Sequence, residues 1–389
     1  MSAVIKLKIK SLLLCLFVVL FLVLLLIFPS SASEGIKNGL NYSANLLLPS
    51  LFPFMVLSSF AIRSGFSDIL GKFFSPVTKF LFGLPKICSA AIILSLVGGF
   101  PVGAKCVQLL YDEKKITEAQ AERMMIFCVC SGPAFLITAV GAIMLKNVTV
   151  GIILYISQVI SCIILGIISK YIYIPKKNIK ENINNTFVSE KNESINKSIV
   201  SEFILSCSDG ASSIISMTAL VLIFSLFINI AEKNGVISFV SDILAILGIK
   251  SNMSDVILPI ILEVTGACNK ICGGGLPLWV MSFAVGFGGM CVHLQIFDIL
   301  RNLKINKIRF IAFRFVNAVI SSVVTYIVCI FYTPVSDTFS NYENSSVVLT
   351  YGTVAGTIAL IFMSIIFLLS LKKPHFSSKK SFLRNENGC

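Results

Sequence analysis

Charged residues are scarce in this chain. Asp, Glu, Lys and Arg make up 13% of its 389 residues, against about 25% in an ordinary soluble domain. Hydrophobic residues make up 56%. A chain this apolar cannot cover its own surface with polar groups, which excludes a soluble enzyme, a secreted disulfide scaffold and a disordered protein. The composition predicts an all-α polytopic membrane protein.

The motifs of catalysis are also missing. The chain has two His and contains no Gly-Lys-Ser/Thr nucleotide loop, no Ser-His-Asp set and no His-Glu-x-x-His pair. The 12 Cys are scattered without zinc spacing and are interpreted as small buried hydrophobic residues. We therefore expect no enzyme activity, no metal and no cofactor. The net charge of +13 lies in loops between apolar runs, where it sets membrane topology, so nucleic acid is not an expected partner.

Apolar runs predict about ten transmembrane helices plus a re-entrant hairpin. The first helix lies within residues 1–30 and is interpreted as retained, because its apolar run is longer than that of a signal peptide. Residues 46–84 contain Pro49, Pro53 and several charges and predict the hairpin, while 236–249 predicts a short crossing. We place the N-terminus, residues 105–123, the linker with Lys170, Lys250, residues 300–309 and the C-terminal tail in the cytoplasm. Of the 32 Lys and Arg, 23 then lie inside and 4 outside, and five in or beside the hairpin and the helices are assigned to neither side.

Gly-rich and Pro-rich breaks interrupt the apolar runs at matching places in two halves of the chain, residues 40–170 and 200–332. Gly103 and Gly266 are 163 residues apart, and Gly132 and Gly288 are 156 apart. The topology gives matched segments opposite orientations, which is typical of inverted repeats in secondary transporters. A helix broken inside the membrane must line a cavity or pack within the protein. The alternative is that these glycines only allow close helix packing.

Polar side chains near the breaks complete a candidate binding site. Lys105 and the N-termini of half-helices are the expected partners of an anionic substrate. Glu263 is a candidate proton or cation site, or the partner of Lys105, and His293 is either functional or a packing residue. Snorkelling to the interface is the alternative for Lys105 and the favoured interpretation of Arg314. The candidate substrate-binding residues are Gly99, Pro101, Gly103, Lys105, Ser131, Gly132, Pro133, Glu263, Thr265, Gly266, Asn269, Gly288, Gly289, His293 and Gln295.

Five motifs are distinctive as a set: Leu-Pro-Ser-Leu-Phe-Pro-Phe at 48–54, Gly-Phe-Pro-Val-Gly-Ala-Lys at 99–105, Ser-Gly-Pro-Ala-Phe at 131–135, Leu-Glu-Val-Thr at 262–265 and Phe-Gly-Gly-Met-Cys-Val-His-Leu-Gln at 287–295. In these motifs the chain resembles the YlbJ-type sporulation integral membrane proteins, which belong with the nucleoside-recognition, or Gate-domain, membrane proteins. The similarity extends over roughly residues 40 to 330.

The resemblance implies a transporter built from two Gate-like repeats, residues 40–170 and 200–332, with a final transmembrane helix and basic tail in 333–389. The implied substrate is dipicolinate, a small dianion, moved across the outer forespore membrane of a sporulating bacterium. The alternatives are a transporter of nucleosides or another small metabolite, and a sporulation membrane scaffold without transport. The expected partners are a small anionic substrate and the lipid bilayer, and the sequence leaves open whether the chain forms a homo-oligomer.

Overall fold

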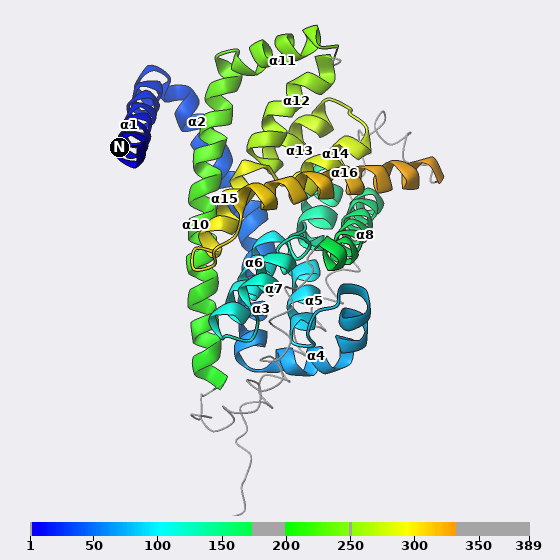
Figure 1. Cartoon of the computed structure of the whole chain (residues 1–389). Helices are drawn as coiled ribbons and strands as arrows, with labels where there is room; N and C mark the ends of the chain where they lie inside the picture. Colours follow the sequence, from blue (N-terminus) through cyan, green and yellow to red (C-terminus); the bar gives the residue numbers. More distant parts are fainter. Residues whose placement is uncertain (1, 173–198, 249–250, 332–389) are drawn as a thin grey trace, which may run out of the picture. The chain divides into compact units, whose positions relative to one another are not determined.

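The computed structural model describes residues 2–172, 199–248 and 251–331. Within these ranges the chain is helical and has no β-strand (Figure 1). Three short segments are π-helical, η1 to η3. In chain order the elements are α1 (Ser2–Ile27), α2 (Pro29–Tyr42), η1 (Ser43–Leu47), α3 (Leu48–Arg63), α4 (Phe66–Val77), η2 (Thr78–Phe82), α5 (Cys88–Gly98), α6 (Phe100–Asp112), α7 (Glu118–Met124), η3 (Ala134–Met144), α8 (Val148–Ile172), α10 (Ile199–Lys233), α11 (Val236–Ile246), α12 (Ser251–Leu262), α13 (Val264–Gly273), α14 (Leu278–Phe287), α15 (Gly289–Ile299) and α16 (Lys307–Phe331).

Five helical runs among the described residues are long and apolar enough to cross a membrane. They are the continuous run α2–η1–α3, α8, α10, the run α14–α15, and α16. This confirms the predicted fold class, an all-α polytopic membrane protein. The expected C-terminal transmembrane helix and nearly all of the linker 171–199 lie outside the described residues.

The two longest helical runs, α2–η1–α3 and α10, have 35 residues each and pack against one another. Gly35 lies against Leu226, and Gly210 lies against Val56, so the two runs are antiparallel. A Cβ on Gly35 would lie 2.6 Å from the Cα of Leu226, and one on Gly210 would lie 2.9 Å from the Cγ2 of Val56. Glycine at these positions therefore permits the close approach of the two backbones.

Residues 46–63, the first part of the hairpin expected at residues 46–84, are not a separate limb, because they continue the run α2–η1–α3, and the chain turns at Gly65 into α4. Pro49 follows the π-helical segment η1, and Pro53 lies inside α3. Neither Pro49 nor Pro53 therefore interrupts this helical run.

The chain turns back on itself at Gly99, between α5 and α6. Gly99 has φ 88°, a left-handed conformation that favours glycine. A Cβ on Gly103 would lie 2.8 Å from the Cβ of Ser95, whereas residues eight positions apart in a straight helix are separated by about 12 Å. Helices α5 and α6 therefore form a helical hairpin with its tip at Gly99. Each limb is about 16–20 Å long, less than the roughly 30 Å of a bilayer core.

A second hairpin forms in the other half of the chain, with its tip at Glu263 between α12 and α13. Asp255 and Val256 near the start of α12 line one cavity together with Lys270 and Gly274 at the end of α13. These positions share a cavity only if α13 folds back along α12. The preceding helix α11 is about 16 Å long, too short to make the crossing expected at residues 236–249 by itself.

Candidate functional site

The tips of both hairpins meet at one small cavity, which we call the central cavity. Its volume is about 50 Å³. It draws residues from both halves of the chain, and six of the predicted site residues are among them. The lining residues are Leu47, Leu51, Gly99, Phe100, Pro101, Gly132, Phe135, Met217, Val221, Glu263, Val264, Thr265, Cys291, Val292 and Gln295.

Glycines hold each hairpin tip against the break in the following segment. In the first half, a Cβ on Gly99 would lie 2.9 Å from the backbone nitrogen of Gly132. In the second half, a Cβ on Gly289 would lie 3.2 Å from the backbone nitrogen of Glu263. The same backbone-to-backbone contact thus recurs in the two halves. The predicted breaks are brought together in space, and only residues without a side chain allow this distance.

Glu263 is the N-cap of α13. Its Oε1 accepts a hydrogen bond from the backbone N–H of Thr265 at 2.7 Å, and its Oε2 accepts one from the N–H of Gly266 at 2.6 Å. The residue is 2% exposed and lines the central cavity. Its carboxylate occupies the positive end of α13, so this half-helix N-terminus is not available to a substrate anion.

Lys105 does not line the central cavity. Its Nζ lies 4.0 Å from the Oδ2 of Asp209 on α10, and the Nη2 of Arg63 donates to the same oxygen at 2.6 Å. Arg63 also lies 4.0 Å from Glu202. The partner of Lys105 is therefore Asp209 and not Glu263, and its charge is balanced by an acidic side chain.

Arg314 on α16 is buried between the halves, so the snorkelling interpretation was wrong. It is 1% exposed and donates hydrogen bonds to the backbone carbonyls of Val129 and Gly286. Its guanidinium carbon lies 5.4 Å from the centre of the Phe100 ring, which lines the central cavity. Sequence reasoning noted Arg314 as a charge in an apolar run but did not place it in the site. The only sign of its role in the sequence was that Arg314 is a single charge within an apolar run.

Hydrogen bonds between buried polar side chains join α8, α14 and α16 near the breaks. Sequence reasoning missed this network. The Nδ2 of Asn317 donates to Gln158 Oε1 at 3.3 Å and to the carbonyl of Gly286 at 3.1 Å. Ser161 Oγ donates to Asn317 Oδ1 at 2.8 Å. All three side chains are buried. The signal in the sequence is weak, because single polar residues at helical spacing in apolar runs also occur in ordinary helix packing.

His293 lies among aromatic rings beside the break at Gly288. It is fully buried, its Nε2 lies 3.0 Å from the carbonyl oxygen of Phe287, and its ring meets those of Phe287 and Phe310 edge to face. Ser131 Oγ donates to the carbonyl of Val285 at 3.4 Å and so joins the two halves. These contacts place both residues beside the breaks but outside the lining of the central cavity.

Asn269 and Gly266 line a second cavity of about 280 Å³, which we call the side cavity and which also contains Glu263, Tyr42 and Lys270. Asn269 Nδ2 donates to the hydroxyl of Tyr42 at 2.8 Å. Glu263 therefore borders both cavities. The remaining predicted residues lie at turns and close contacts of the backbone. Gly103 faces the carbonyl of Cys128, Pro133 precedes η3, and Gly288 is the left-handed residue between α14 and α15.

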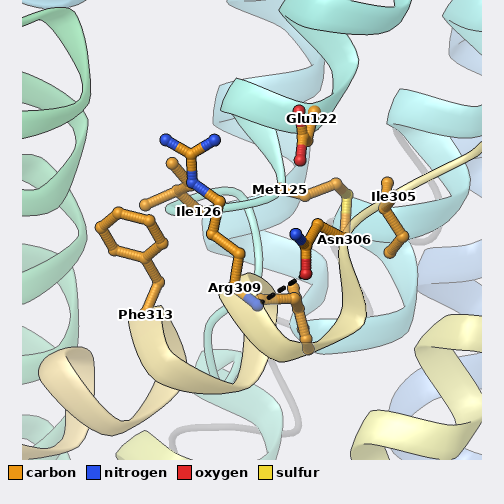
Figure 2. Close-up of a pocket in the computed structure, with 8 residues that line it drawn as sticks. Glu122, Met125, Ile126, Ile305, Asn306, Arg309 and Phe313 are labelled. Atoms are coloured by element: carbon orange, nitrogen blue, oxygen red, sulfur yellow. Dashed lines mark hydrogen bonds between the residues drawn. The ribbon is translucent and has the colours of Figure 1, made fainter. Parts of the chain in front are cut away.

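Two other hollows carry no convergent polar groups that would define a site. A hollow of about 10 Å³ between α7 and the start of α16 has Glu122, Asn306 and Arg309 at its edge (Figure 2). It has barely room for a water molecule, and Asn306 there caps α16 by accepting from the backbone N–H of Arg309. A cavity of about 390 Å³ between α12, α14 and α16 is lined by apolar side chains, including Trp279.

The fold and its apolar helices define an integral membrane protein, and comparison with known proteins narrows the class. The family model described as "Nucleoside recognition", called Gate, matches residues 45–148, which include the first hairpin. The chain is also 23% identical over 338 residues to the sporulation integral membrane protein YlbJ of Bacillus subtilis (strain 168), a match that covers 81% of this chain and 82% of that protein. No solved structure matches the chain significantly. These findings confirm the resemblance to the YlbJ-type proteins.

Proposed function

We propose that this chain is a membrane transporter of a small organic anion, and not an enzyme. The observation that carries the proposal is the central cavity, which lies where the tips of two helical hairpins from different halves of the chain meet. Broken helices cost hydrogen bonds that lipid cannot replace, so their retention around a cavity favours a binding role. Alternating access around a site between two repeats is the general mechanism of secondary transporters.

Matched elements support inverted repeats. The bounds of the two 35-residue runs differ by 170 at each end, and the left-handed glycines that follow them, Gly65 and Gly235, also differ by 170. Each of these glycines precedes a short helix, α4 or α11. The hairpin tips at Gly99 and Glu263 differ by 164. The matched 35-residue runs are antiparallel, as repeats of opposite orientation require.

This arrangement makes the two hairpins open to opposite sides of the membrane. Lys114 and Lys115 follow the first hairpin, and the positive-inside rule assigns them to the cytoplasm. Cysteine-accessibility labelling at Asn184 and Asn341, both outside the described residues, tests the underlying topology. We expect Asn184 inside and Asn341 outside. Labelling of both from one side would contradict the inverted arrangement.

Dipicolinate is the substrate that the YlbJ-type resemblance favours, with the outer forespore membrane as its location. A central cavity of about 50 Å³ holds water but not a pyridine ring with two carboxylates, so the structure corresponds to a closed state. Transport then requires the hairpin tips to separate. Nucleosides are the second candidate, because the matching family model bears that description.

The test is uptake of labelled dipicolinate into vesicles that contain the purified full-length protein, with uridine as a competitor. We expect uptake above that of empty vesicles and little competition by uridine. Gly132→Leu should block uptake by wedging the hairpin tip, whereas Gly273→Leu, where a Cβ has open space, is the matched control. Uptake of uridine alone would favour the nucleoside transporter. Uptake of neither compound would favour a scaffold.

A further inference from the structure

Arg314 is a buried charged side chain that lies against Phe100 in the lining of the central cavity. Its hydrogen-bond partners are two backbone carbonyls, those of Val129 and Gly286, and its Nε is buried without a partner. Val129 precedes the Ser131–Pro133 break, and Gly286 precedes the break at Gly288. The guanidinium therefore lies between the broken segments of both halves.

The charge of Arg314 has no acidic partner among the described residues, which distinguishes it from Lys105 and Arg63. Lys105 and Arg63 share Asp209. Arg123 on α7, another buried arginine that donates to backbone carbonyls, also satisfies its Nε through Ser169 Oγ at 3.1 Å. A charge within an apolar membrane helix costs about 2.5–3.5 kcal/mol on insertion scales. A retained, unbalanced guanidinium in that place therefore points to a ligand that supplies the negative charge.

Phe100 lies between this charge and the space where a ligand would bind. Its ring covers the guanidinium at 5.4 Å and lines the central cavity, while a Cβ on Gly288 would lie 3.5 Å from the tip of the ring. Phe100 is also the first residue of α6, directly after the hairpin tip at Gly99. Any separation of the hairpin tips would shift this ring and open the path from the cavity to Arg314.

We propose that Arg314 is the counter-charge for a carboxylate of the substrate, and that Phe100 covers it in the closed state. This inference rests on the proposed transport function. It makes Arg314, and not Lys105, the cation that binds the substrate. A guanidinium forms two parallel hydrogen bonds with one carboxylate, and the free Nε is one donor of such a pair. The ligand class is an organic carboxylate with a flat ring able to lie against Phe100.

The test compares two probes of nearly the same shape, the dianion dipicolinate and the neutral pyridine-2,6-dicarboxamide, on the full-length protein in detergent. Dissociation constants are measured for wild type, Arg314→Met, Arg314→Lys and Arg123→Lys. We expect wild type to prefer the dicarboxylate, and Arg314→Met to lose about tenfold or more of that preference. Arg314→Lys keeps the charge but not the paired geometry and should fall between them. Arg123→Lys, the matched control, should bind both probes as wild type does.

The ratio between the two probes separates binding from structural support. A purely structural role for Arg314 would weaken both probes together and leave the ratio unchanged, which would overturn the inference. If Arg314→Met does not fold, Arg314→Lys decides by the same ratio. A wild-type protein without preference for the dicarboxylate would also overturn it. If the Arg314 variants still take up dipicolinate into vesicles, the proposed transport function holds and only the proposed role of Arg314 is refuted.

Discussion

Replacing Gly99 by Ala should destabilise the protein far more than replacing Gly65 by Ala, although both glycines have left-handed φ. Gly99 has φ 88° and ψ −169°, a region that is essentially restricted to glycine and costs another residue about 1–3 kcal/mol. Its new Cβ would also lie 2.9 Å from the backbone nitrogen of Gly132, which adds about 1–3 kcal/mol for overpacking. The expected loss in the free energy of unfolding is therefore about 2–6 kcal/mol.

Gly65 is the matched control, because its conformation is left-handed but its surroundings are empty. It has φ 79° and ψ 2°, and a Cβ there would have no heavy atom within 4 Å. Only the backbone cost of about 1–2 kcal/mol applies. SDS-induced unfolding of the purified variants measures both free energies, and vesicle uptake shows whether Gly99→Ala also stops transport. Equal losses for the two variants would refute the claim that the hairpin tip packs against the Gly132 backbone.

Three further changes test other contacts of the site. Lys105→Met should lower dipicolinate affinity less than Arg314→Met does, because the charge of Lys105 is already balanced; the reverse order would restore Lys105 as the substrate cation. Glu263→Ala should cost about 2–4 kcal/mol, because two buried N–H groups lose their partner, whereas the exposed cap change Thr117→Ala should cost about 1 kcal/mol in the same unfolding assay. In a background without native cysteines, Gly39→Cys with Ser225→Cys should form a disulfide visible by gel mobility, because a Cβ on Gly39 would lie 3.1 Å from the Ser225 Cβ; absence of the crosslink under oxidation would contradict the antiparallel pairing.

The sequence predicted the hairpin tips only in part. Gly99 and Glu263 were both candidate site residues, because Gly and Pro inside apolar runs mark breaks whatever the tertiary structure. Which break reverses the chain was not predictable in the same way. Pro49 and Pro53 mark the apolar stretch at 46–60 as strongly, yet the helix continues there: Pro49 follows the π-helical segment η1, and Pro53 lies inside α3.

The sequence alone determined that this protein lies in a lipid bilayer, because hydrophobic content and scarcity of charge are properties of the chain and not of its packing. The positions of the helix breaks were also indicated by the local sequence, through residues such as Gly132. Only the tertiary structure decided the electrostatics. Lys105 is paired because α10 brings Asp209 to it, and Arg314 is buried because α16 packs between the two halves, so the charge that lacks a partner could not be found by composition or spacing.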